Sequence, residues 1–234
     1  ITTSLETARA MIGAGEVFID DKIADKPGVL YVSNVSIRLK DRCPYVSRGG
    51  FKLEEGLNHF KIDPTGWVCI DIGASTGGFT DCLLQHNAKK VYAIDVAYGQ
   101  ISWKIRQDTR VVTLERFNAR NISPSDIKET GIDFAVMDVS FISITTLLPA
   151  LLTLFRERVN ILALIKPQFE LPKEEVGKGG VVSLPSLHQK AIEKIVGFID
   201  SIGLISNGVI ASPILGPKGN REFLISISST LDVP

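Results

Sequence analysis

The sequence of 234 residues contains few cysteines, few histidines and no excess of charge of either sign. Its three cysteines, Cys43, Cys69 and Cys82, form no Cys-x-x-Cys pair, which argues against a zinc site or a disulfide scaffold and favours a reducing compartment. The three histidines are scattered without ligand spacing, so no metal site is predicted. The 26 Lys and Arg residues equal the 26 Asp and Glu residues, which excludes a uniformly basic nucleic-acid binder.

The sequence also lacks an apolar run that could cross a membrane. The longest run, residues 142–155, is interrupted by serine, threonine and proline and is shorter than the roughly 20 residues that span a bilayer. We interpret it as a helix of the hydrophobic core. The chain starts without the basic segment and cleavage site of a secretory signal, so we expect a cytoplasmic protein with no stable membrane association.

What the sequence does contain is two segments with different patterns. In residues 1–43, apolar residues at helical spacing predict a short helix that ends near Gly15. Short strands separated by turn residues are then predicted at 16–20, 21–23 and 35–39. A segment of this size buries little apolar surface, so we expect a small α+β domain of low intrinsic stability.

In residues 44–234, strand-length apolar runs alternate with helical segments. The expected strands are 68–72, 91–94, 111–114, 134–137, 161–165, 204–211 and 223–227, and the expected helices are 78–86, 100–106, 142–155 and 184–202. This succession predicts an α/β domain with a parallel sheet covered on both faces. No helix separates the last two strands, which should therefore pair antiparallel. A Rossmann-like, mostly parallel sheet with an antiparallel last strand is typical of S-adenosylmethionine-dependent methyltransferases.

A glycine-rich turn follows the first strand of this domain, in the segment Asp71-Ile-Gly-Ala-Ser-Thr-Gly-Gly-Phe-Thr80. Glycines at a strand-to-helix turn let the backbone and the helix N-terminus approach a ligand closely. The Gly-x-Gly-x-x-Gly fingerprint of dinucleotide binding is absent. Asp95 ends the next strand, 24 positions after Asp71, where an acid can accept hydrogen bonds from ribose hydroxyls. The pattern indicates a cofactor that contains adenosine, either S-adenosylmethionine or NAD.

Four charged residues are expected at or beside the carboxyl edge of the sheet, namely Lys52, Asp138, Lys166 and Glu222. Charges at strand ends are often merely solvated, but opposite charges at the ends of adjacent strands favour a site. Such a cluster suits removal of a proton from an alcohol that then attacks a methyl group on a sulfonium. A lysine amine becomes a base only when it is desolvated or lies near a second cation. We therefore hypothesise that Lys166 is the base and that the other three adjust and orient it.

Six motifs together resemble the FtsJ-like RNA ribose methyltransferases, and within them the TlyA family, over nearly the whole chain. They are Ser-Arg-Gly-Gly-Phe-Lys-Leu (47–53), the glycine-rich turn (71–80), Met-Asp-Val-Ser-Phe-Ile-Ser (137–143), Ile-Lys-Pro-Gln-Phe-Glu (165–170), Gly-Lys-Gly-Gly-Val-Val (177–182) and Asn-Arg-Glu-Phe (220–223). The resemblance implies a catalytic tetrad of Lys52, Asp138, Lys166 and Glu222. It also implies S-adenosylmethionine as methyl donor and 2′-O-methylation of cytidine in ribosomal RNA.

The turn and the resemblance together give one set of expected cofactor residues: Asp71, Gly73, Ala74, Ser75, Gly77, Gly78, Phe79, Asp95, Val96, Asn118 and Asp138. Residues 1–43 resemble part of a small RNA-binding domain of the S4 type, and residues 44–234 the methyltransferase domain. Between Arg38 and Lys52 the sequence has five basic residues and one acidic residue, a local excess that suits phosphate binding. The expected RNA-binding residues are Arg38, Lys40, Arg42, Arg48, Lys178, Lys218 and Arg221.

Two alternatives to the ribosomal RNA methyltransferase remain open. Proteins of the TlyA family often carry a haemolysin label, which suggests a membrane-active protein, although the sequence has no basic amphipathic helix. An NAD-dependent oxidoreductase could use a similar sheet, but the missing fingerprint and the antiparallel last strand disfavour it. Separately, we expect residues 170–183 to form a mobile binding loop when RNA is absent.

Overall fold

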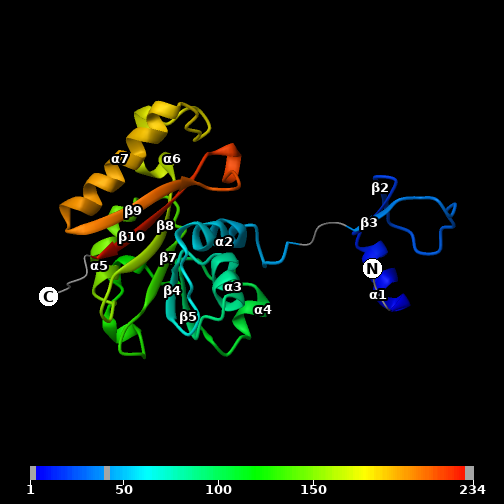
Figure 1. The fold of residues 1–234 in the computed structure, drawn as a ribbon, viewed down its shortest axis with the longest axis horizontal. Helices are drawn as coiled ribbons and strands as arrows, with labels where there is room; N and C mark the ends of the chain where they lie inside the picture. Colours follow the sequence, from blue (N-terminus) through cyan, green and yellow to red (C-terminus); the bar gives the residue numbers. More distant parts are fainter. Residues whose placement is uncertain (1–3, 40–42, 230–234) are drawn as a thin grey trace. The chain divides into compact units, whose positions relative to one another are not determined.

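A computed structural model describes residues 4–39 and 43–229. The chain divides into two compact units, Ile1–Cys43 and Pro44–Pro234 (Figure 1). Each unit has its own sheet, of three strands in the first and seven in the second. The two units are therefore described separately.

The first unit consists of one helix and a small antiparallel sheet. Its elements are α1 (Leu5–Gly13), β1 (Val17–Ile19), β2 (Lys22–Ala24) and β3 (Ile37–Leu39), in the sheet order β2-β1-β3. The Ser4 hydroxyl accepts a hydrogen bond from the backbone N–H of Thr7 and caps α1. Each strand has three residues, so the three expected strands are present but short. Val17 and Ala24 are the buried hydrophobic residues among the described residues of this unit, which leaves it a very small core.

The second unit contains a mostly parallel sheet in the order β6-β5-β4-β7-β8-β10-β9. The strands are β4 (Val68–Ile72), β5 (Lys90–Asp95), β6 (Val111–Glu115), β7 (Phe134–Met137), β8 (Asn160–Ile165), β9 (Leu204–Ala211) and β10 (Phe223–Ser229). β10 lies between β8 and β9 and is antiparallel to both. The expected α/β sheet with an antiparallel last strand is confirmed.

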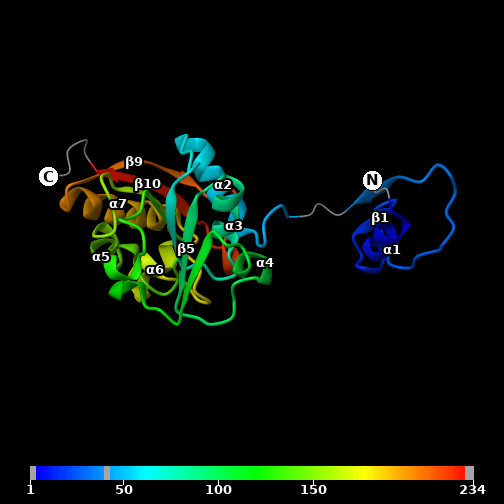
Figure 2. The same cartoon turned by 90° about the horizontal axis from the view of Figure 1, so that it is seen from below.

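Helices cover both faces of this sheet (Figure 2). α2 (Gly49–Phe60), α3 (Gly78–Gln85) and α4 (Trp103–Arg106) pack on one face, and α5 (Leu148–Leu152) and α7 (Pro185–Ser201) pack on the other. Along β7, Phe134 and Val136 face the first group, while Ala135 and Met137 face the second. Because both faces are buried, a central strand such as β7 is continuously apolar instead of alternating.

Two expected helices are shorter than the sequence pattern suggests. Residues 142–155 do not form one core helix but a 3-10 turn, η3 (Ile144–Thr146), followed by α5, with Pro149 in the first turn of α5. Proline has no N–H to donate and is favoured at a helix start, so it divides the run there. The expected helix 100–106 is reduced to α4, because the N–H of Ser102 donates to the carbonyl of Thr76 and holds extended backbone before it.

The remaining short elements lie in the connections. They are the 3-10 turns η1 (Ala119–Asn121), η2 (Pro124–Asp126), η4 (Lys173–Glu175) and η5 (Pro217–Gly219), and the short helix α6 (Pro167–Glu170). η1 and η2 follow β6, α6 and η4 follow β8, and η5 precedes β10. Those connections carry residues of the candidate site.

The contact between α2 and the sheet predicts a specific loss of stability. A Cβ on Gly56 would lie 2.5 Å from Cδ2 of the buried Leu162 in β8. We expect Gly56→Ala to lower the free energy of unfolding by about 1–3 kcal/mol, measured by denaturant unfolding, because the core must shift to admit the methyl group. The control is Gly197→Ala in α7, where a Cβ meets nothing within 4 Å. That variant should be unchanged or more stable by about 0.5–1 kcal/mol, and equal stability of the two variants would refute the close packing.

Candidate active site

Charged residues from distant parts of the chain meet at one edge of the large sheet. Asp138 directly follows β7 and Lys166 directly follows β8, two parallel neighbours whose carboxyl ends share that edge. Because β10 runs antiparallel, its start lies at the same edge, and the pairing of Phe223 with Ile165 places Glu222 beside Lys166. Sheet topology alone therefore brings three of the four expected catalytic residues together.

Lys52 reaches the same place from α2. The neighbouring Leu53 and Leu57 pack into the core beneath α2, and this fixes the helix against the sheet. The Nζ of Lys52 lies 2.6 Å from Oε2 of Glu222 and 3.9 Å from Oδ2 of Asp138. Lys52 is only 7% exposed and Glu222 is fully buried.

Lys166 completes the cluster from the other side of Asp138. Its Nζ lies 2.5 Å from Oδ1 of Asp138 and donates a hydrogen bond of 3.1 Å to Oγ of Ser140. Asp138 is thus shared between two ammonium groups, and the cluster holds two positive and two negative charges. Burying charged groups has a high desolvation cost that is tolerated only when they are paired, and such clusters are commonly functional.

Two cavities meet at Asp138; Lys52 lines the first of them, and Lys166 and Glu222 line neither. The first, here called the α2 cavity, has a volume of about 380 Å³ and is lined by the start of α2 with Lys52, by residues 73–76 and by residues 214–217. The second, the β5 cavity, has a volume of about 480 Å³ and is lined by residues 94–97, 117–120 and 138–142. Gly73, Ser75 and Asp138 line both. A molecule in one cavity can therefore meet a molecule in the other beside Asp138.

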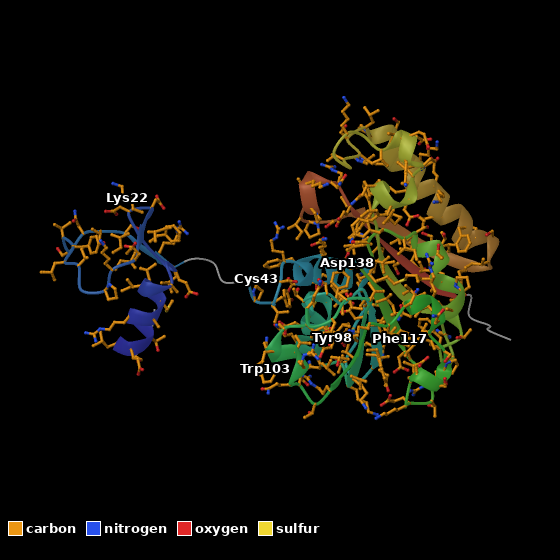
Figure 3. The ribbon with its side chains drawn as sticks, turned by 180° about the vertical axis from the view of Figure 1, so that it is seen from behind. Lys22, Cys43, Tyr98, Trp103, Phe117 and Asp138 are labelled. Carbon is orange, nitrogen blue, oxygen red and sulfur yellow. The ribbon has the colours of Figure 1, made fainter. Side chains whose placement is uncertain are left out.

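The β5 cavity has the features expected of an adenosine site. Asp95 ends β5, and its carboxylate accepts hydrogen bonds from the backbone N–H groups of Ser75 (2.7 Å) and Ala97 (2.8 Å), which leaves further lone pairs on both oxygens. The apolar side chain of Phe117 and the carboxylate of Asp138, both labelled in Figure 3, also line the cavity. An acid for ribose hydroxyls beside apolar walls for a base fits an adenosine-containing cofactor.

Gly73 shows why the turn after β4 needs glycine. Its φ is +86°, and a Cβ there would lie 2.5 Å from the carbonyl oxygen of Asp138. Only glycine fits this close approach between the ends of β4 and β7. The turn therefore brings backbone groups to the boundary of the two cavities, where a ligand can contact them.

The expected cofactor residues fall into three groups by position. Six line the β5 cavity, namely Gly73, Ser75, Asp95, Val96, Asn118 and Asp138. Ala74, Gly78 and Phe79 line the α2 cavity instead. Asp71 and Gly77 line neither cavity; Gly77, at φ +94°, precedes α3 and lies against Ile105.

Asp71 is fully buried beneath the turn. One carboxylate oxygen accepts a 2.7 Å hydrogen bond from Oγ1 of Thr80, and Oδ1 has no hydrogen-bond partner. Burial raises the pKa of Asp71 to about 7, assisted by the neighbouring carboxylates of Asp138 and Asp95 and opposed by the Thr80 hydrogen bond. Asp71 thus joins β4 to α3 through Thr80, and its carboxyl group gains or loses a proton near neutral pH.

The expected RNA-binding residues are only partly assembled. Arg48 lines the α2 cavity, and Lys178, Lys218 and Arg221 are exposed on the same unit. In the first unit, Arg38 lies 4.3 Å from the centre of the Phe18 ring and 3.5 Å from Asp21. Lys40 and Arg42 lie outside the described residues.

Some residues at the site carry no expected role from the sequence. Ser140 contacts Lys166, and residues 214–217 form a wall of the α2 cavity. Ser140 could have been found as a polar residue three positions after the end of β7, whereas the wall depends on tertiary packing. The expected mobile loop, residues 170–183, is contacted by the side chain of Asn220. Its Oδ1 accepts a hydrogen bond from the N–H of Val182 (3.0 Å), and its Nδ2 donates to the carbonyl of Gly180 (2.8 Å). The mobility of this loop stays a prediction.

No group of three or more potential metal ligands occurs among residues 4–39 and 43–229. Over the same ranges, no helix has both the length and the apolar character needed to cross a membrane.

Comparison with known proteins shows what the chain is similar to. The FtsJ-like methyltransferase family model matches residues 45–229. The 16S/23S rRNA (cytidine-2'-O)-methyltransferase TlyA of Mycobacterium tuberculosis is 42% identical over 99% of this chain and 87% of its own length. A crystal structure titled "a putative hemolysin from Lactococcus lactis" is 45% identical with a TM-score of 0.79, and covers 82% of this chain and 91% of its own. A SAM-dependent methyltransferase from Aquifex aeolicus shares the fold at 17% identity, with a TM-score of 0.55 over 79% of this chain and 95% of its own.

The raised pKa of Asp71 predicts a pH-dependent stability difference. An acid whose pKa rises on folding contributes stability at low pH, and this contribution is lost as the pH rises from about 4 through about 7. Asp71→Asn imitates the protonated acid and should escape this loss. Its stability relative to wild type should increase by roughly 1–3 kcal/mol between pH 5 and pH 8, measured by denaturant unfolding.

Asp200→Asn, at an exposed position of α7, is the matched control for this measurement. Its difference from wild type should stay constant between the two pH values. A constant difference for Asp71→Asn as well would show that Asp71 is ionised throughout.

Proposed function

The chain belongs to the FtsJ-like methyltransferase family, and from this we propose that it transfers a methyl group from S-adenosylmethionine to the ribose 2′-hydroxyl of a cytidine in ribosomal RNA. The observation that carries the proposal is the ion-pair cluster of Lys52, Asp138, Lys166 and Glu222, whose Asp138 lies where two cavities meet. When bound, S-adenosylmethionine supplies an electrophilic methyl group on its sulfonium. The residues of the chain must then position and deprotonate the acceptor.

In this proposal the two cavities have separate tasks. The β5 cavity holds the cofactor, with Asp95 accepting from the ribose hydroxyls, and the α2 cavity receives the ribose of the RNA nucleotide. Lys166 takes the proton from the 2′-hydroxyl. Asp138 orients Lys166, while Glu222 holds Lys52, the second ammonium group beside Asp138. Lys52 thereby supplies the second cation that a lysine base requires nearby.

The RNA partner is proposed on two grounds. The 42% identical relative is named for ribosomal RNA cytidine methylation, and Arg48 lies at the α2 cavity with Lys178, Lys218 and Arg221 exposed on the same unit. Basic residues of this kind bind phosphates. We propose that residues 1–43 are a partial S4-type RNA-binding domain that assists residues 44–234. Ribosomal RNA or ribosomal subunits would be the substrate, in the cytoplasm.

The other two functions are supported less well. The membrane-active alternative depends on the hemolysin name of a relative, whereas the cluster offers groups placed for proton removal. NAD-dependent oxidation would also use an acid at the end of β5, so Asp95 does not distinguish it. The FtsJ-like match over residues 45–229 favours methyl transfer.

Replacing Lys166 tests the proposed base. We expect both Lys166→Ala and Lys166→Arg to lower the rate of methyl transfer by about 10²–10⁴-fold, because arginine keeps the charge but does not release a proton. The measurement is incorporation of labelled methyl groups from S-adenosylmethionine into intact and dissociated ribosomes, followed by mapping of the 2′-O-methyl group. Lys190→Ala is the control, since Lys190 pairs with Glu175 on the surface. Activity of Lys166→Ala within about tenfold of wild type would exclude the role, and a wild type without ribosomal activity would exclude the function.

Cofactor choice is tested by calorimetry. S-adenosylmethionine should bind and NAD should not, and Asp95→Ala should weaken S-adenosylmethionine binding by about 10-fold to 100-fold, because hydrogen bonds to a carboxylate are lost. Asp200→Ala serves as the control. Tight binding of NAD would instead support the oxidoreductase.

A further inference from the structure

The loops that follow β7 and β8 lie side by side and are joined by three sets of contacts. In the first, Lys166 contacts Asp138 and Ser140. In the second, the rings of Phe141 and Phe169 lie with their centres 5.0 Å apart. The third is the contact of Glu170 with Ser143 and Ile144, at the start of η3. Of the three, it is the one that involves no residue of the proposed catalytic cluster and no residue with a role proposed above.

Glu170 is a buried acid, 3% exposed, at the end of α6. Its Oε2 accepts a 2.5 Å hydrogen bond from Oγ of Ser143, and its Oε1 accepts a 3.0 Å hydrogen bond from the N–H of Ile144. Lys194 of α7 lies 3.4 Å from Oε2 and donates a 2.5 Å hydrogen bond to the backbone carbonyl of Glu170. The carboxylate therefore joins residues 138–143, here called the β7 loop, to α6 and α7.

The β7 loop needs such a hold because its backbone is strained. Phe141 has a φ of +65°, in the left-handed region that a bulky aromatic residue rarely adopts, and its side chain is 91% exposed. Strained backbone persists only where the surroundings fix it. Ser140 and Phe141 lie between two anchors, Asp138 at the end of β7 and Ser143 on Glu170. Without the second anchor the loop can relax, and Ser140 can move relative to Lys166.

We infer that Glu170 is a positioning residue of the reaction, which holds the β7 loop through Ser143 and Ile144 and thereby sets the position of the Nζ of Lys166. The role as a positioning residue for methyl transfer rests on the proposed function. Glu170 itself contacts neither cluster lysine and acts through Ser143 and Ile144.

Glu175 provides a matched control from the same segment. It also pairs with a lysine of α7, with 2.5 Å between its Oε1 and the Nζ of Lys190. Its hydrogen bonds and ion pairs involve no residue of the β7 loop. Glu175→Gln therefore removes an acid-to-α7 ion pair without releasing the loop.

The experiment compares Glu170→Gln, Ser143→Ala, their double variant and Glu175→Gln in the full chain. Burial raises the pKa of Glu170, so the assays are run at pH 8, above neutral pH, to favour the ionised form of the acid. We expect Glu170→Gln to lower kcat for ribosomal methylation by about tenfold or more, with a smaller change in the Kd of S-adenosylmethionine. The kcat of the double variant should lie within about twofold of the kcat of Glu170→Gln, because both changes break the same hydrogen-bonded link.

Two further measurements do not need activity. Hydrogen exchange of the Ile144 amide should accelerate in Glu170→Gln, because its acceptor changes. The rate at which acetic anhydride labels Lys166, followed by mass spectrometry, should change by about threefold or more, since access to its amine depends on the loop. Glu175→Gln should leave both unchanged.

The inference is overturned if kcat, Ile144 exchange and Lys166 labelling in Glu170→Gln match those in Glu175→Gln, or if the effects of Glu170→Gln and Ser143→Ala simply multiply. Should Glu170→Gln fail to fold, Ser143→Ala decides by the same readouts. A wild type that methylates no ribosomal substrate would remove the proposed function. Unchanged labelling and exchange would remove the positioning role, so the two failures are distinguishable.

Discussion

The mutual neutralisation of four charges, three of them buried, is the constraint around which the larger unit is organised. Lys52, Lys166 and Glu222 are almost wholly enclosed, and each would be strongly destabilising without its partner. Their pairing requires α2 to be fixed against the sheet, β7 and β8 to end at the same edge, and β10 to run in the opposite direction. Packing that has no chemical role of its own, such as Gly56 against Leu162, therefore determines where the lysine amines lie.

Much of this arrangement could be predicted from local sequence patterns. Apolar runs mark the strands, and a polar residue directly after each run marks the shared edge, which is how Asp95, Asp138 and Lys166 are found. The antiparallel last strand follows from the missing helix between residues 211 and 223. These features are predictable because each depends on a short stretch of chain and on one rule of sheet topology.

Other features depend on contacts between distant segments and escape such patterns. Lys52 and Glu222 are 170 positions apart, and only the packing of α2 shows that they pair. Asp71 belongs to the glycine-rich motif but lies beneath the turn, because its position on β4 turns the side chain toward Thr80 of α3. In residues 142–155 the apolar pattern conceals the helix start at Leu148, with Pro149 in the first turn. Glu170 stands in a recognisable motif, yet its contacts with Ser143 and Ile144 appear only in three dimensions.

The insertion of β10 between β8 and β9 has a consequence for the order of folding. The strand that carries Glu222 to the site is the last described strand in the chain, yet it occupies an interior position in the sheet. During synthesis, β8 and β9 leave the ribosome before the strand that separates them, so neither can gain its final partner until that strand arrives. Lys52 stays without Glu222 over the same period. The enzyme can therefore become active only when synthesis of this domain is nearly complete. A nascent chain that stops before β10 exposes two unpaired strand edges and leaves Lys52 without the carboxylate of Glu222.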